Sequence, residues 1–314
     1  MSGAHNGIVK TAARLYCLLS PGSSQGVVLR RGPSSQVLLI QWNLGDDSFA
    51  VGQWLKGRVY ERRCDLSPDG KLLVYFAADF RRSVGSWTAI SRPPYFTALA
   101  LWPKGDCWGG GGLFASDTRL KVNHRSDQIS LDPSFSVPKW LSVDSCGDWS
   151  GCGEDDPIWS SRLVRDGWKQ TAWSEKTKDD RGAEIWIEYH PPIQWKKAHP
   201  LWPKRYTLQM SVLGIKARNG PWILTEHSVH GDRGYAGTIG QSEWADWSRE
   251  GDLLFAQSGC LYRLRAEKGR LGPIKESEII ADFNDLAFRA LEPPDEARIW
   301  PARSLKVRRK ARRR

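Results

Sequence analysis

The pattern most suggestive of metal binding is a pair of histidines, His227 and His230, flanked by Glu226 and Asp232. On a helix this spacing would place both rings on one face, but on a strand it places them on opposite faces. The segment is typical of a strand that runs into a turn. We therefore expect a polar turn and no metal site, and we expect the chain to use no cofactor.

Other patterns with catalytic potential are incomplete. An acidic loop lacks the EF-hand spacing and is expected to be solvated; its carboxylates are Asp148, Glu154, Asp155 and Asp156. The glycine-rich stretch 107–112 lacks the Lys and Ser/Thr of a P-loop and is expected to be a flexible turn. No G-x-S-x-G motif occurs. A carboxylate pair for glycoside hydrolysis remains open, because its separation is spatial.

Two stretches combine arginine with tryptophan, the side chains most enriched at binding hot spots. Their candidate partner-binding residues are Trp54, Arg62, Arg63, Arg162, Arg165 and Trp168. These side chains also suit stacking and phosphate contacts with single-stranded nucleic acid. The alternative is that each Arg pairs with an Asp inside the fold and each Trp packs in the core. We expect Arg62 and Arg165 to be exposed contacts near turns.

The C-terminal end is strongly basic. The chain carries 46 Lys and Arg against 35 Asp and Glu, a net charge of +11. Seven of these cations lie in the segment 304–314: Lys306, Arg308, Arg309, Lys310, Arg312, Arg313 and Arg314. Without them, 39 cations face 35 anions, which leaves +4 for the rest of the chain. We expect this tail to be disordered, and either solvated or in contact with nucleic-acid phosphates.

Composition is that of a soluble globular protein, with 40% hydrophobic and 26% charged residues. No apolar run approaches the roughly 18 residues of a membrane-spanning helix. Arg14 interrupts the best candidate for a signal peptide. The six cysteines form no C-x-x-C pair. A cytoplasmic location with reduced thiols is therefore expected, without membrane association.

Short apolar runs separated by Gly- and Pro-containing turns predict about 20 strands and an all-β fold. The run Val37–Ile40 is apolar at every position, so that strand is expected to be covered on both faces. The spacing within 279–290 would also fit a helix, but strands are favoured there.

Two hairpin-like segments, 65–74 and 246–255, align at an offset of 181 residues. Each is a strand, a tight turn with a glycine, and an apolar strand. The residues expected to shape these turns are Asp65, Asp69, Gly70, Asp246 and Gly251. A carboxylate before a turn can accept backbone N–H groups and fix its geometry. Looser copies of Leu-Trp-Pro-Lys, at 101–104 and 201–204, suggest further diverged repeats.

The D-x-S-P-D-G hairpin at 65–70 resembles the signature of TolB-like β-propeller repeats, relatives of WD-repeat propellers, and the second segment keeps Asp246, Ser248 and Gly251. The resemblance implies a ring of small sheets. Physical reasoning agrees, because hairpins too small to bury their own faces must cover one another. The 17 Trp rings would fill the wedges between sheets. We predict a single propeller of five or six four-stranded blades over residues 1–303.

Propellers of this kind are mostly interaction platforms. The predicted function is therefore a non-catalytic protein-interaction module, or a subunit of a larger cytoplasmic assembly, with another protein as its partner. One alternative is a nucleic-acid-binding propeller that uses the basic tail and an Arg/Trp face. A second alternative is a carbohydrate-active propeller enzyme.

Overall fold

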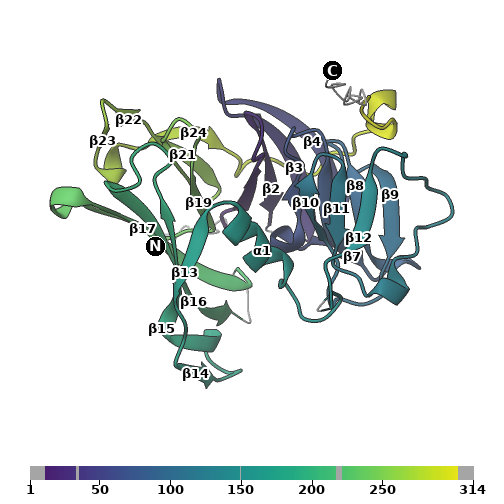
Figure 1. The fold of residues 1–314 in the computed structure, drawn as a ribbon, viewed down its shortest axis with the longest axis horizontal. Coiled ribbons are helices and arrows are strands. Elements are labelled where there is room, and N and C mark those ends of the chain that lie inside the picture. The colour runs from purple at the N-terminus through teal and green to yellow at the C-terminus, as the bar shows by residue number, and fades with distance from the viewer. Residues whose placement is uncertain (1–10, 33–34, 149, 217–220, 303–314) are drawn as a thin grey trace, which may run out of the picture.

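The computed structural model describes residues 11–302, apart from 33–34, 149 and 217–220. The described chain is built of β-sheets, with one α-helix, α1 (Ile158–Arg165), and several short 3-10 turns. In Figure 1 the sheets are arranged around α1, which lies near the middle of the view. No helix in this part of the chain is long and apolar enough to cross a membrane.

Five sheets follow one another along the chain. The first contains β1 (Arg14–Leu19), β2 (Gln25–Arg31), β3 (Gln36–Asn43) and β4 (Ser48–Lys56). The second contains β5 (Arg58–Val59), β6 (Asp65–Leu66), β7 (Leu73–Asp79), β8 (Gly85–Ser91) and β9 (Ala98–Pro103). The third contains β10 (Gly112–Ser116), β11 (Arg119–Val122) and β12 (Ser142–Ser145), the last of which runs parallel to β11.

The fourth sheet is the largest, and it contains β13 (Trp168–Ala172), β14 (Lys176–Asp179), β15 (Ile185–Ala198), β16 (Tyr206–Lys216), β17 (Ile223–Gly231) and β18 (Ala236–Gln241). The fifth contains β19 (Trp244–Trp247), β20 (Leu253–Gln257), β21 (Cys260–Leu264) and β24 (Glu278–Asp282). A small hairpin of β22 (Ala266–Glu267) and β23 (Arg270–Leu271) follows β21. The start of the segment 279–290 is thus a strand, as predicted.

The central strands are apolar on both faces. In β3, Val37 and Leu39 pack into a cluster with the second sheet, whereas Leu38 and Ile40 pack against the fifth. β20 behaves in the same way, since Leu253 and Phe255 face the fourth sheet and the alternate residues face the first. Successive side chains of a strand point to opposite faces, so an unbroken apolar run requires a neighbour on each side. The prediction for Val37–Ile40 is confirmed.

Contacts link the five sheets in chain order, and the last sheet touches the first. β1 contacts β6 on one side and β19 and β20 on the other. β10 contacts β6 and β7, and β17 contacts β19. Between the third and fourth sheets, α1 takes the place of a direct sheet contact, since it touches both β10 and β13. The sequence analysis did not predict this helix.

Residues 58–66 do not form one continuous strand. β5 and β6 both pair with β7, but a 3-10 turn at Glu61–Arg63 separates them. The last ladder bond before the interruption is the one from the N–H of Tyr60 to Phe76 O, at 2.9 Å. Interruptions of this kind change the direction in which side chains point. Here the interruption buries Arg62 and Arg63.

The two hairpins that align in sequence share one hydrogen-bond pattern. The backbone N–H of Ser67 donates to Leu72 O at 2.8 Å, and the N–H of Leu72 donates to Ser67 Oγ at 3.0 Å. Ser248 makes the same pattern with Asp252, at 3.1 Å for the hydroxyl bond. The second loop is therefore one residue shorter. The glycines at the turns have φ values of +73° and +92°, the region that glycine adopts most readily.

Two expectations need correction. The Leu-Trp-Pro-Lys copies are not equivalent repeats, because 101–104 ends strand β9 whereas 201–204 forms the turn between β15 and β16. The stretch 107–112 is not a loosely packed turn. A Cβ on Gly111 would lie 2.0 Å from Arg63 O, and Arg63 Nη1 donates to the carbonyls of Cys107 and Gly109 at 2.7 Å.

The shared serine of the hairpins yields a paired prediction. We expect Ser67→Ala and Ser248→Ala each to lower the free energy of unfolding by about 1–2 kcal/mol, because each leaves a buried backbone N–H without its acceptor. Urea denaturation measures both values. Ser134→Ala, at an exposed position, is the control and should change stability by less than about 0.5 kcal/mol. Similar free energies of unfolding for all three variants would contradict a structural role of the Ser67 and Ser248 hydroxyls.

Candidate functional site: the central cavity

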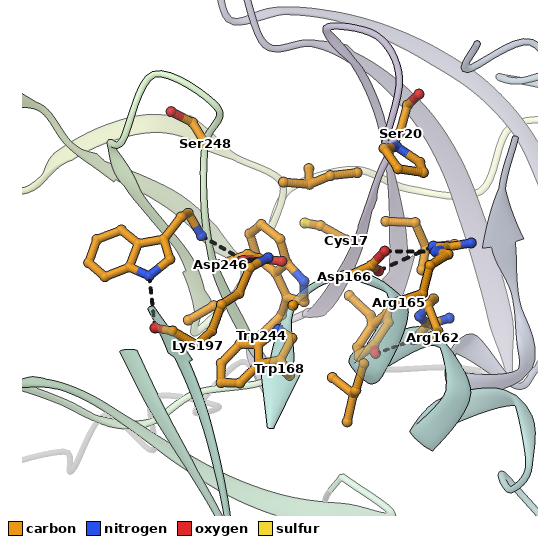
Figure 2. A pocket seen from close by; sticks show the side chains of 18 of the residues that line it. Cys17, Ser20, Arg162, Arg165, Asp166, Trp168, Lys197, Trp244, Asp246 and Ser248 are labelled. Atoms are coloured by element: carbon orange, nitrogen blue, oxygen red, sulfur yellow. Dashed lines mark hydrogen bonds and ion pairs between the residues drawn. The ribbon is translucent and has the colours of Figure 1, made fainter. Parts of the chain in front are cut away.

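A cavity of about 400 Å³ lies where the inner edges of the sheets converge on α1. Its walls come from β1, the turn before β6, α1, the start of β13, and the segment 243–250. Figure 2 shows the side chains around it. Five aromatic rings contribute to the lining: Tyr16, Trp159, Trp168, Trp244 and Trp247. Aromatic rings combined with placed polar groups are typical of a ligand site.

Arg165, on the last turn of α1, is held between two carboxylates. Its Nη1 and Nη2 donate to the two oxygens of Asp65 at 2.7 and 2.9 Å. Its Nε donates to Asp166 Oδ1 at 2.8 Å. Burial raises the pKa of the Asp65 carboxyl, although the charge of Arg165 opposes that shift. The guanidinium is thereby fixed in orientation, and Figure 2 shows its bonds to Asp166.

The second hairpin contributes a corresponding pair. Asp246 occupies the position equivalent to Asp65, and it accepts a hydrogen bond from Lys197 Nζ. Burial raises the pKa of Asp246, while Lys197 opposes that shift and Asp166 adds to it. The two Asp–cation pairs therefore lie close enough for Asp166 to act on both. Both aspartates expected to shape turns also line the cavity.

Arg162 and Arg62 flank Tyr16. Arg162 donates to the hydroxyl of Tyr16 at 2.6 Å and to the carbonyl of Cys64. Arg62 lies over the rings of Tyr16 and Trp159, at 5.3 and 5.2 Å from the centroids. Its side chain is 6% exposed, and its Nε has no hydrogen-bond partner. A buried donor without a partner is costly to the fold, so Arg62 is a candidate ligand contact.

Glu243 is the other residue in the lining with a buried polar atom that lacks a partner. Its Oε2 is buried without a hydrogen bond. Burial raises the pKa of this carboxyl to about 7, against the weaker opposing effects of a hydrogen bond from its own backbone N–H and of the charge of Arg14. Glu243 therefore changes charge near neutral pH, which is a common property of functional carboxyls.

His227 lines the same cavity but is neutral. Its Nδ1 lies 2.8 Å from Ser242 Oγ, and burial, together with the charge of Arg62, lowers its pKa to about 3. His230 is exposed and bonds to Ser228. The expectation that the two rings point apart is confirmed, since one is buried and the other is not.

The expected exposure is wrong for Arg62, whose side chain is 6% exposed, and Arg165 is only 23% exposed. Four of the Arg/Trp candidates are buried: Arg62, Arg63, Arg162 and Trp168. The sequence predicted turns near these positions, but the 3-10 turn and α1 direct the side chains inward. Arg62, Arg162, Arg165 and Trp168 come together in the cavity lining. Whether they contact a partner stays a prediction.

The other two candidates lie elsewhere. Arg63 donates to Asp155 Oδ1 at 3.0 Å and holds the glycine-rich loop. Trp54, on β4, packs against Phe288, with ring centroids 6.0 Å apart. Neither lines the cavity. The basic tail from Lys306 to Arg314 lies outside the described residues.

Several lining residues carried no signal in the sequence. Lys197 lies within the long strand β15, and Glu243 precedes β19. The sequence did contain a signal for helix α1. Pro157 precedes its first turn, and Arg162 and Arg165 are three residues apart, which places them on one face of a helix. Which residues meet across the cavity depends on contacts between different sheets.

No family model matches this chain, and no curated protein matches it. Among solved structures, the chain is similar to a putative 6-phosphogluconolactonase from Bacteroides fragilis. The two share 11% sequence identity and a TM-score of 0.29, over 87% of this chain and 97% of that one. A likeness at this level says nothing about activity. The resemblance to TolB-like and WD-repeat propellers therefore stays a prediction.

Removing the Asp65 carboxylate should destabilise the fold. We expect Asp65→Ala to lower the free energy of unfolding by about 2–4 kcal/mol, because it leaves the half-buried guanidinium of Arg165 and the buried N–H of Phe114 without an acceptor. Asp166→Ala is the matched control. Its carboxylate is 24% exposed, so the loss should stay within about 1 kcal/mol. Thermal and urea unfolding measure the stability of both variants. Equal losses of stability would contradict the prediction that Asp65 contributes more than Asp166.

Glu243 should make stability depend on pH. Its folded pKa is raised, so the folded state holds the proton more tightly than the unfolded state. The resulting advantage is complete below about pH 4.5 and is lost as pH rises through about 7. We expect Glu243→Gln to gain up to about 3 kcal/mol relative to wild type at pH 8, but not at pH 4. The same difference at both pH values in urea titrations would refute this assignment.

Proposed function

We propose that this protein is a non-catalytic binding module, in which five propeller-like sheets surround a cavity that receives part of a partner protein. The observation that carries the proposal is the aromatic-lined cavity of about 400 Å³, a size within the usual range of about 300–1,000 Å³ for ligand pockets. Partner recognition by an apolar side chain fits such a wall, because buried aromatic surface supplies most of the binding energy at hot spots.

The charges of the lining favour this occupant over nucleic acid. Five cations line the cavity: Arg62, Arg162, Arg165, Lys197 and Arg249. Five carboxylates accompany them: Asp65, Asp166, Glu243, Asp246 and Glu250. A polyanion requires an excess of positive charge, which this balanced lining does not offer. A nucleic-acid role would then depend on the tail.

A carbohydrate-active enzyme has less support. Glycoside hydrolysis uses two carboxyl groups that flank the scissile bond. Three of the lining carboxylates, Asp65, Asp166 and Asp246, are already engaged by Arg165 or Lys197. Of the other two, Glu250 is exposed. Glu243 is then the one lining carboxyl that is shielded from solvent and not engaged by a cation, and alone it does not complete such a pair. Binding without catalysis therefore describes the lining best.

A substitution that fills the cavity tests this proposal. Leu163 on α1 lines the cavity, so we expect Leu163→Trp to occupy part of its volume. Peptides selected from a random displayed library against the wild-type protein should carry apolar anchors. Their affinity for Leu163→Trp should fall at least about tenfold, which corresponds to roughly 1.4 kcal/mol.

The control lies one residue further along the same helix. Val164 is 62% exposed and does not line the cavity. Val164→Trp adds the same ring to the outer surface, and it should leave peptide affinity unchanged. Circular dichroism establishes that both variants are folded. Equal binding by the two variants, or selection of no peptides with apolar anchors, would exclude the cavity as the partner site.

A further inference from the structure

A second, smaller cavity of about 30 Å³ shares Tyr16, Arg62 and Glu243 with the central one. Arg14 and Arg31 also line it. Arg58 lines the adjoining hollow, again with Arg62. We call these four side chains, Arg14, Arg31, Arg58 and Arg62, the arginine cluster.

The backbone pairing forces two of these charges together. Arg14 and Arg31 are directly opposite each other across the β1–β2 pair. Like charges at such positions destabilise a sheet. Burial lowers the pKa of Arg31; the charge of Glu61 opposes this shift, whereas the charges of Arg58 and Arg14 add to it. The cluster is thus a concentration of positive charge that the fold itself does not favour.

The protein neutralises this charge only in part. Glu61 forms an ion pair with Arg62 at 3.3 Å, and Glu243 also lines the cavity. Glu154 and Asp155 line the adjoining hollow, where Asp155 is paired with Arg63. Within the described residues, Arg14, Arg31 and Arg58 form no ion pair with a carboxylate. The remaining segments contain no Asp or Glu in their sequence (1–10, 33–34, 149, 217–220 and 303–314). No acidic side chain there can compensate the cluster.

Two donor atoms of the cluster also lack partners. Nε of Arg58 and Nε of Arg62 are buried without a hydrogen bond. Arg58 lies instead over the rings of Tyr60 and Trp222, at 4.3 and 5.8 Å from the centroids. Unpaired guanidinium groups are suited to the planar, bidentate binding of phosphate oxygens.

We propose that the arginine cluster binds a phosphoryl group, either as free phosphate or at the end of a small phosphate monoester. The four arginines outnumber Glu61, Glu154 and Glu243, the nearby carboxylates that Arg63 does not hold, so a bound anion would balance the excess positive charge. The smaller cavity has room for about two water molecules, so only the anionic group enters. The organic part of a monoester would lie outside, beside Trp222, which lines the same cavity.

The test measures phosphate binding by isothermal titration calorimetry and by the shift of the melting temperature at low ionic strength. Wild type should bind inorganic phosphate with millimolar or better affinity. Sodium chloride at equal ionic strength should not produce a comparable shift of the melting temperature. Arg31→Gln should weaken phosphate binding about tenfold or more, because charge-assisted hydrogen bonds are lost. Without phosphate it should melt at a higher temperature than wild type, because it relieves like-charge repulsion.

Arg14→Gln repeats the test from the opposite strand, in case Arg31→Gln fails to fold. Arg119→Gln is the control, because Arg119 is exposed on β11 and lies outside the cluster. Unchanged phosphate affinity in both cluster variants, or no phosphate binding by wild type, would overturn the proposal. Phenyl phosphate then distinguishes the source: tighter binding than inorganic phosphate identifies an ester, and equal binding identifies the free anion.

This inference does not rest on the partner site. Arg14 and Arg31 do not line the central cavity, and Leu163 does not line the smaller one. Leu163→Trp should therefore bind phosphate as wild type does, and Arg31→Gln should retain peptide binding. Each site can fail its test without affecting the other.

Discussion

The central strands of this protein have no face that can be left to solvent. In β3 and β20, alternate side chains enter different apolar clusters, so each of these sheets needs a neighbour on both sides. A stack satisfies this requirement for every sheet except those at its ends. Here the fifth sheet covers the face of the first that the second sheet leaves bare. The succession of sheet contacts, from the first sheet round to the fifth and back, follows from that single requirement.

The convergence of the sheets brings polar groups into the interior. Strand ends and turns meet at the cavity, where backbone and side-chain polar groups must find partners. Asp65 and Asp246 occupy equivalent positions in two hairpins, and each receives a cation from another element, Arg165 from α1 and Lys197 from β15. Because a buried charge is tolerated only when it is paired, these pairs hold α1 and the fourth sheet to the hairpins. The cavity is consequently rigid where its charges are paired.

The two cavities differ in how fully their charges are balanced. The central one contains as many carboxylates as cations and is rich in aromatic rings. The smaller one and its adjoining hollow are lined by the arginine cluster and by fewer carboxylates, namely Glu61, Glu154 and Glu243, together with Asp155, which is paired with Arg63. Arg62 and Glu243 line both cavities, and each has an atom without a hydrogen-bond partner. Buried polar atoms without hydrogen-bond partners lower stability, and the proposed ligands would supply partners for them.

The sequence by itself determined the β-rich class, the two-sided burial of Val37–Ile40 and the two matching hairpins, because these depend on local periodicity and turn chemistry. It also identified Arg62 and Arg165 as notable residues, but it assigned them to an exposed surface. Only the tertiary structure decided that they point inward, since the break in the strand at Glu61–Arg63 and the helix α1 arise from packing between sheets. The pairing of Asp65 with Arg165 spans 100 residues, and no local pattern specifies a contact of that separation.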